Sequence, residues 1–227
     1  MGEKITEDLK YPVRINKYLA LKKISTRRGA DALIQEGKVF INGKQALLGS
    51  QVREKDTVEV KGAKKKDYIY FAYNKPVGIE TDSPKEGLFP LGRLDKNSHG
   101  LLILTNDGRI TDSLLNPKYF HEKEYVVRTK EKLRGSFKQK MEEGVNIEGY
   151  VTKKCRVKII NDFTFRIVLT EGKKHQIRRM CSALFQEVGD LKRDRVVNIK
   201  LGNLKPGELR PINGKELQTF LESIGMQ

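Results

Sequence analysis

The sequence predicts an α+β protein of two unequal domains, and three observations lead to this prediction. The chain of 227 residues is long enough for one small and one larger domain. Patterns typical of helices and patterns typical of strands occur in both parts of it. Between the parts, residues 61–67 are highly charged and have no apolar anchor, which is typical of a linker. We therefore expect domains at residues 11–60 and 68–227.

The composition is typical of a globular protein that binds a polyanion. Hydrophobic residues make up 37% of the chain, charged residues 33%, and the net charge is +16. No apolar run approaches the ~18 residues of a membrane span, and the first residues lack the apolar core of a secretory signal. Cys155 and Cys181 stand apart, without metal-ligand spacing, which indicates thiols in a reducing compartment. We expect a cytoplasmic protein with a nucleic-acid partner, no metal and no membrane.

Residues 11–60 have the pattern of two short helices followed by short strands. Apolar residues at positions 15, 18 and 19 share one helical face. Ser25 or Thr26 is the expected N-cap of a second helix, which Gly37 ends. Residues 39–41, followed by Asn42-Gly43, indicate a strand that enters a tight turn.

The second domain alternates strands and helices. A strand at residues 68–73 is expected to break at Asn74-Lys75-Pro76-Val77-Gly78, and residues 79–90 to form a loop. A helix after Gly108 stops before Pro117. The further expected elements are a strand from residue 121, a helix at 131–143, strands near 145–160 and at 165–169, a Pro/Gly-rich turn at 204–211 and a helix at 215–224.

The segment from Gly92 to Gly108 holds the strongest candidate for a catalytic group. If residues 92–95 are extended, Arg93 and Asp95 lie on one face and Leu94 on the other. The apolar run at residues 101–105 has no polar alternation, which indicates a strand covered on both faces. The glycines at 92, 100 and 108 allow tight backbone turns.

A second cluster of candidates lies at residues 171–184. Ile177, Met180, Cys181 and Leu184 form one apolar stripe, so a helix is expected there after a glycine turn. Arg178 lies at the edge of the buried face, where its side chain can reach a carboxylate. Further along, Arg193 and Arg195 lie two residues apart on an extended segment and are expected to share a face. Three more cations near the start of the helix are expected to meet RNA phosphate: Lys173, Lys174 and Arg179.

The string GRLDKNSHGLLILTNDG at residues 92–108 resembles the catalytic motif of the RNA pseudouridine synthases, in the branch of RsuA, RluB, RluE and RluF. Further elements similar to this family are the turn at 74–78, Lys-x-Tyr-x-Val at 123–127 and His-Gln-Ile-Arg at 175–178. Residues 151–155 resemble the RluF branch in particular. The resemblance covers residues 11–220 and implies a mixed, largely antiparallel sheet with flanking helices, and no cofactor.

The first domain resembles an S-four-type RNA-binding domain, also called the αL motif. Residues 11–66 contain 14 basic and 5 acidic residues, which is over half of the net charge. Phosphate binding needs several cations on one face. We expect such a surface to contain Arg14, Lys17, Arg27, Arg28 and Lys38.

The resemblance also implies roles for three residues. Asp95 is the catalytic carboxylate, Tyr125 stacks on the target base, and Arg178 pairs with Asp95. Arg93 is expected to contact the substrate beside Asp95. His175 is expected to orient other groups or to support the structure, since the family's chemistry needs no histidine base.

The reaction converts uridine to pseudouridine and needs one ionised carboxylate in a dry pocket. Asp95 either adds to C1′ of the ribose or removes a ribose proton, and the sequence leaves both routes open. Burial would raise the pKa of Asp95, and a paired Arg178 would offset that effect.

We expect a monomeric enzyme that acts on ribosomal RNA, with the large-subunit (23S) RNA as substrate. The alternatives are a small-subunit or tRNA target, or a non-catalytic protein of ribosome assembly. The sequence leaves the modified uridine undefined.

Overall fold

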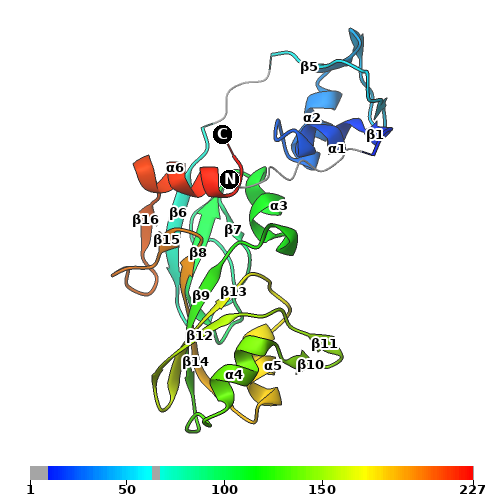
Figure 1. Cartoon of the computed structure of the whole chain (residues 1–227). Helices are drawn as coiled ribbons and strands as arrows, with labels where there is room; N and C mark the ends of the chain where they lie inside the picture. Colours follow the sequence, from blue (N-terminus) through cyan, green and yellow to red (C-terminus); the bar gives the residue numbers. More distant parts are fainter. Residues whose placement is uncertain (1–9, 63–66, 227) are drawn as a thin grey trace. The chain divides into compact units, whose positions relative to one another are not determined.

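The computed structural model describes residues 10–62 and 67–226, which form two compact units, Met1–Asp67 and Tyr68–Gln227 (Figure 1). Residues 63–66 of the expected linker 61–67, and the final residue of the expected domain 68–227, lie outside the described residues. No described helix has the length and apolar character needed to cross a membrane.

In the first unit, helices α1 (Ile15–Leu21) and α2 (Arg27–Gln35) enclose a small apolar core. The Thr26 hydroxyl accepts a hydrogen bond from the Gly29 amide at 2.9 Å, so Thr26 rather than Ser25 caps α2. Asn42 and Gly43 both have positive φ, which confirms the expected tight turn. The strands are β1 (Val13–Arg14) paired with β4 (Gln51–Val52), and an antiparallel sheet of β3 (Lys44–Gln45), β2 (Val39–Ile41) and β5 (Val58–Val60).

The second unit is built on a nine-stranded sheet within the described residues. Its main path runs β12-β13-β9-β14-β8-β6-β16, while β15 pairs with β14 and β7 with β8. The pair of β14 with β8 is parallel and the other pairs are antiparallel, which confirms a mixed, largely antiparallel sheet. The strands are β6 (Tyr70–Lys75), β7 (Phe89–Leu91), β8 (His99–Thr105), β9 (Lys123–Thr129), β12 (Arg156–Asn161), β13 (Thr164–Leu169), β14 (Val188–Val196), β15 (Ile199–Lys200) and β16 (Leu209–Pro211).

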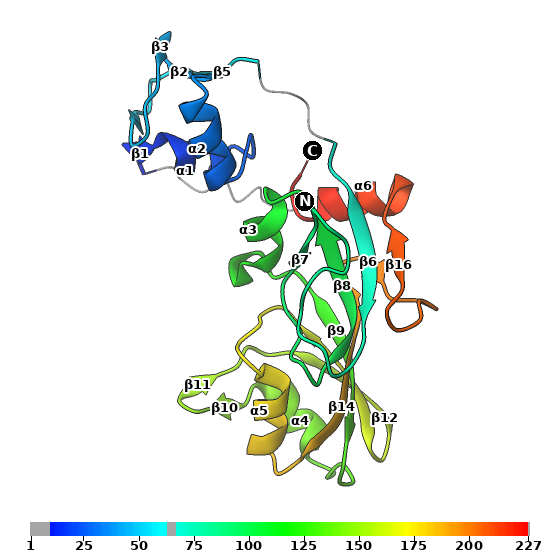
Figure 2. The same cartoon turned by 180° about the vertical axis from the view of Figure 1, so that it is seen from behind.

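Helices cover the two ends of this sheet. Helix α4 (Phe137–Glu143) and helix α5 (Gln176–Ala183) lie together at one end, beside the hairpin of β10 (Asn146–Ile147) and β11 (Tyr150–Val151) (Figures 1 and 2). Helix α6 (Gly214–Ser223) lies at the other end, with α3 (Ile110–Leu115) in that half of the unit. A short 3₁₀ helix, η1 (Pro117–Tyr119), follows α3. Each half therefore has its own apolar core.

Strand β8 is the centre of the second unit. Its four residues from Leu101 to Leu104 are at most 1% exposed, which confirms a strand covered on both faces. Gly100 has φ +101 and lies within this strand rather than in a turn. A Cβ at Gly100 would overlap the backbone of Arg193, because β14 approaches closely there.

Several sequence-based expectations are wrong. Strand β6 continues to Lys75 and does not break at Asn74, and the expected turn at 204–211 ends in strand β16. The expected loop at 79–90 ends in the edge strand β7, where Pro90 is tolerated. The expected helix at 131–143 begins only at Phe137, because the Leu133 amide donates to the Asp162 carbonyl instead of continuing a helix. Arg193 and Arg195 do not share a face: Arg193 lies opposite Tyr125 and Arg195 opposite Glu124, because the register shifts between them.

We expect Gly100→Ala to lower the free energy of unfolding by about 3 kcal/mol, because the new Cβ combines backbone strain with overlap against β14. Gly149→Ala is the matched control, since Gly149 also has positive φ but has open space around it. It is expected to cost about 1 kcal/mol. Urea unfolding curves measure both values, and equal losses would contradict the close approach of β14.

Candidate active site

The loop between β7 and β8 presents Asp95, and its backbone is held in place by Thr81. The Thr81 hydroxyl donates to the Leu94 carbonyl at 2.6 Å and accepts from the Leu94 amide at 2.9 Å. Leu94 itself is buried against Leu102 and Leu104. The burial of Leu94 between exposed Arg93 and half-exposed Asp95 matches the expected alternation. Asp95 is thus fixed by its neighbour rather than by its own side chain.

Lys75 also holds this loop in place. This residue was not singled out from the sequence. Its ammonium is fully buried and donates to the carbonyls of Pro76 at 2.9 Å, Ile79 at 2.6 Å and Lys96 at 3.4 Å. Burial lowers the pKa of Lys75, while the charges of Glu80 and Asp95 oppose that shift. The Asn-Lys-Pro-x-Gly motif indicated only a turn here, because a sequence does not show which carbonyls a lysine will meet.

Two cationic or titratable groups from α5 and its N-terminal boundary face the Asp95 carboxylate. His175 Nε2 lies 3.4 Å from Asp95 Oδ1, and Arg178 Nε lies 4.0 Å from Oδ2. The side chain of Asp95 remains 32% exposed. Among the residues that the structure describes, Asp95 is therefore only partly covered, and the dry pocket that the reaction needs stays a prediction.

Arg178 makes its shortest contacts with the backbone of the Asp95 loop. Its Nη2 donates to the Asn97 carbonyl at 2.9 Å and to the Ser98 hydroxyl at 3.3 Å. Its Nη1 donates to the Val188 carbonyl at 3.2 Å. Arg178 therefore places a positive charge near Asp95 and also joins α5, β14 and the loop.

Helix α5 carries the stripe that was expected from the sequence. Ile177, Met180 and Cys181 are buried in the core of this half. The residue before the helix, His175, has φ +51, so the left-handed turn lies at His175 and not at the preceding glycine. This turn directs His175 toward Asp95 while the helix is held by its buried face.

Tyr125 lies in β9 between Ile167 of β13 and Arg193 of β14. Its side chain is half-buried and packs against both the α5 core and the cluster that contains Leu94. The structure therefore brings Tyr125 and the Asp95 loop to one part of the sheet.

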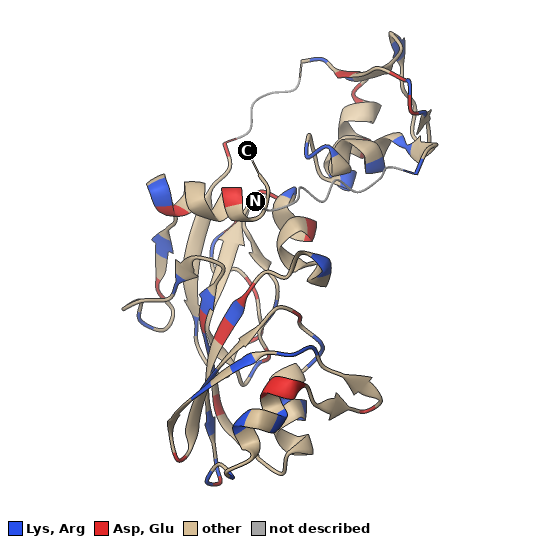
Figure 3. Cartoon of the chain, viewed as in Figure 1, with Lys and Arg blue, Asp and Glu red and all other residues tan. Residues whose placement is uncertain are grey.

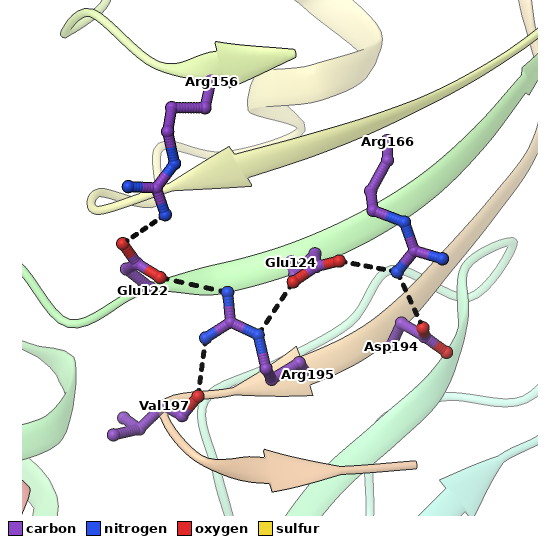
Figure 4. A network of polar contacts seen from close by, with 7 residues as sticks. All are labelled: Glu122, Glu124, Arg156, Arg166, Asp194, Arg195 and Val197. Carbon is purple, nitrogen blue, oxygen red and sulfur yellow. Dashed lines mark hydrogen bonds and ion pairs between the residues drawn. The ribbon is translucent and has the colours of Figure 1, made fainter. Parts of the chain in front are cut away.

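The opposite face of β9 carries an ion-pair network (Figure 4). Arg195 donates to Glu124 at 2.8 Å and to Glu122 at 3.0 Å, and Arg166 donates to Glu124 at 2.6 Å. Burial raises the pKa of Glu124, but its hydrogen bonds to Arg166 and Arg195 hold that pKa below its usual value overall. The acidic residues that precede Tyr125, Glu122 and Glu124, are thus held in ion pairs within the sheet.

The other substrate-contact candidates have different surroundings. Lys173, Lys174 and Arg93 are exposed. Arg179 instead donates to Glu148 at 2.7 Å and to the Ile147 carbonyl at 3.1 Å, so it ties α5 to the β10–β11 hairpin. Its assigned contact with phosphate would require the loss of these bonds.

In the first unit, Lys and Arg lie on both helices (Figure 3). Arg14, Lys17, Arg27 and Arg28 are exposed, and no salt bridge of theirs occurs within the described residues. Lys38 differs, because its ammonium pairs with Glu36 at 2.6 Å. In both units, the residues that the structure describes contain no group of three or more His, Cys, Asp or Glu side chains able to hold a metal ion.

Comparisons with known proteins agree with this fold. The model of the RNA pseudouridylate synthase family matches residues 69–183, and the model of the S4 domain matches residues 13–58. The chain belongs to the RNA pseudouridylate synthase family and is built as an S4 domain followed by the synthase domain.

Individual relatives cover most of the chain. It is 41% identical to the dual-specificity RNA pseudouridine synthase RluF of Escherichia coli strain K12, over 93% of this chain and 79% of that protein. It is 33% identical to the ribosomal large subunit pseudouridine synthase B of Bacillus subtilis, over 90% and 94%. A crystal structure of a pseudouridylate synthase matches with a TM-score of 0.68 and 28% identity, over 93% of this chain and 99% of that one.

We expect Arg178→Lys to lower kcat about tenfold and Arg178→Met about 10³-fold. A lysine keeps the positive charge near Asp95. It cannot, however, donate to Asn97, Ser98 and Val188 together, as the guanidinium of Arg178 does. Single-turnover rates measure the effect, with Arg156→Met as the control, because Arg156 is 71% exposed and belongs to the opposite face. Equal rates for the lysine and methionine variants would contradict a role for the charge.

The exposed arginines of α2 are expected to contribute to the salt dependence of RNA binding. The double substitution Arg27→Gln, Arg28→Gln should reduce the log–log slope of affinity against salt by about 1.4–1.8, since each lost phosphate contact removes about 0.7–0.9. Lys138→Gln, Lys140→Gln makes the same charge change on exposed positions of α4 and serves as the control. Identical slopes for the two double variants would show that α2 meets no phosphate.

Proposed function

We propose that this protein isomerises uridine to pseudouridine at a defined position of ribosomal RNA, with Asp95 as the catalytic carboxylate. The observation that carries the proposal is the placement of Asp95. It is fixed through its backbone, partly exposed, and faced by His175 and Arg178. The large-subunit RNA is the proposed substrate, supported by the function named for the Bacillus subtilis relative. Such a substrate places the activity in the cytoplasm.

The reaction breaks the N1–C1′ bond, turns the uracil and joins C5 to C1′, so no atom is gained or lost. An ionised Asp95 either adds to C1′ or removes a ribose proton. Arg178 places a positive charge 4.0 Å from Oδ2 of Asp95, and Nε2 of His175 lies 3.4 Å from Oδ1. These contacts are long enough to leave the carboxylate oxygens available to the ribose.

Tyr125 is proposed to hold the detached base while it turns. Its ring is half-buried between two apolar clusters, which fixes its orientation. Its hydroxyl is also a candidate to assist the loss of the C5 proton. The uridine must leave its stack to reach Asp95, at a cost of about a few kcal/mol, and contacts of Lys173 and Lys174 with phosphate would offset that cost.

The dual specificity of the RluF relative favours a second candidate, in which this protein modifies another RNA class as well. Mapping pseudouridines in all cellular RNA, from cells with and without the protein, tests both candidates. Loss of a single site in large-subunit RNA is the expected result. Loss of sites only in small-subunit RNA or tRNA would overturn the choice of substrate, and an unchanged map would overturn the activity.

We expect Asp95→Asn to keep the fold and RNA affinity but to lower single-turnover conversion by at least about 10³-fold. Asparagine keeps the shape of the side chain and removes the charge, and the position is exposed enough to accept it. Asp162→Asn, at an exposed aspartate in the turn between β12 and β13, is the control. Appreciable conversion by Asp95→Asn would remove the assignment of Asp95.

A further inference from the structure

A group of aromatic and lysine side chains is built onto the start of α5, and of its members only Lys173 has been given a role above. The Lys153 ammonium lies over the Phe120 ring, 4.2 Å from its centroid, and the Lys173 ammonium lies over the Tyr150 ring at 4.3 Å. These four residues are called the aromatic–lysine surface below. They come from three segments: the chain after η1, the β10–β11 hairpin with the residues after it, and the loop before α5.

One buried carboxylate assembles this surface. Glu171 is 3% exposed and accepts a hydrogen bond from the Tyr150 hydroxyl at 2.6 Å and from the Lys153 amide at 3.0 Å. Gln176 donates to the same carboxylate at 2.9 Å. Gln176 follows His175, which faces Asp95. The surface is therefore built onto the same helix start that supports the catalytic carboxylate.

Phe120 is an exposed member, with 58% of its surface accessible and φ +56. This large apolar ring is exposed at a left-handed backbone position, three residues before the first residue of strand β9. Tyr125 follows five positions later in the chain, so the two Cα atoms are at most about 18 Å apart. Unpaired nucleotides beside a uridine held at Tyr125 can reach this ring.

We propose that Phe120 and Tyr150 stack on unpaired bases of the substrate RNA beside the target uridine, while Lys153 and Lys173 contact the adjoining phosphates. This inference rests on the proposed function. Aromatic rings bind single-stranded bases through their faces, and lysines beside them neutralise the backbone. A cation held over a ring at an exposed site is the weaker contact, so a base can displace it. The lysine then lies beside the phosphate of the stacked nucleotide.

The same arrangement defines the class of substrate. Bases in a duplex are stacked on one another and offer no free face to a protein ring. The aromatic–lysine surface therefore selects a uridine that lies in a loop or bulge with at least one unpaired neighbour. Its role is to determine specificity, and it takes no part in bond rearrangement.

The chain contains a matched control for this proposal. Phe185 is 73% exposed, has φ +58 and lies under Arg134 at 5.4 Å. It follows the C-terminal end of α5, whereas His175 precedes the N-terminal end. Phe120→Ala and Phe185→Ala thus make the same chemical change on the same type of backbone, and only Phe120 belongs to the aromatic–lysine surface.

The test uses the full chain and a stem-loop RNA that contains the uridine modified by the wild type. Phe120→Ala is expected to lower kcat/KM about 5- to 50-fold, Phe120→Tyr to restore it, and Phe185→Ala to change it less than twofold. Abasic nucleotides are then introduced singly at the unpaired positions beside the target. At the stacking position the wild type should lose the same factor, and Phe120→Ala should lose nothing further.

Equal activity of Phe120→Ala and Phe185→Ala would overturn the proposal, and so would a Phe120→Ala defect that persists on every abasic RNA. If the wild type converts no uridine, the proposed function has failed, and a labelled oligouridylate then tests the surface by fluorescence anisotropy. Weaker binding by Phe120→Ala than by Phe185→Ala supports stacking, and equal binding overturns it.

Discussion

The position of Asp95 depends on hydrogen bonds to the backbone on both sides of it. Thr81 brackets Leu94, Lys75 donates to the Lys96 carbonyl, and Arg178 donates to the Asn97 carbonyl. None of these bonds engages the carboxylate itself. The arrangement fixes the loop, while the nearest nitrogens of His175 and Arg178 lie 3.4 Å from Oδ1 and 4.0 Å from Oδ2. Thr81 and Lys75 thus hold the chain through its backbone, whereas Arg178 both holds the chain and faces the carboxylate.

The parallel pairing of β8 and β14 joins the two halves of the sheet behind this loop. Strand β8 begins directly after the loop, and Arg193 of β14 lies opposite both Gly100 of β8 and Tyr125 of β9. The absence of a side chain at Gly100 permits the close approach. The distance between the Asp95 loop and Tyr125 is therefore set by backbone packing, which is less deformable than contacts between long side chains.

Local patterns predicted much of the fold, and long-range register accounts for what they missed. The cap at Thr26, the turn at Asn42-Gly43 and the stripe on α5 depend on neighbouring residues, and all three were predictable. The bulge that separates Arg193 from Arg195 depends on how β14 pairs with β9, which no periodicity reveals. The candidate site follows the same rule. Motifs indicated Asp95, Tyr125 and Arg178, whereas the buried contacts of Lys75 and the partners of Arg179 required the tertiary structure.

In this protein of net charge +16, the two faces of β9 differ in how far their charges are paired. On one face, Glu122, Glu124 and Asp194 are matched by Arg156, Arg166 and Arg195 (Figure 4). These pairs neutralise one another and stabilise the sheet. On the Tyr125 side, Lys173 and Lys174 of the loop before α5 are exposed. Arg93, two residues before Asp95, is exposed as well. Because opposite charges cancel on the first face, the exposed cations on the Tyr125 side remain unpaired with that network and can attract a polyanion toward a carboxylate that would otherwise repel it.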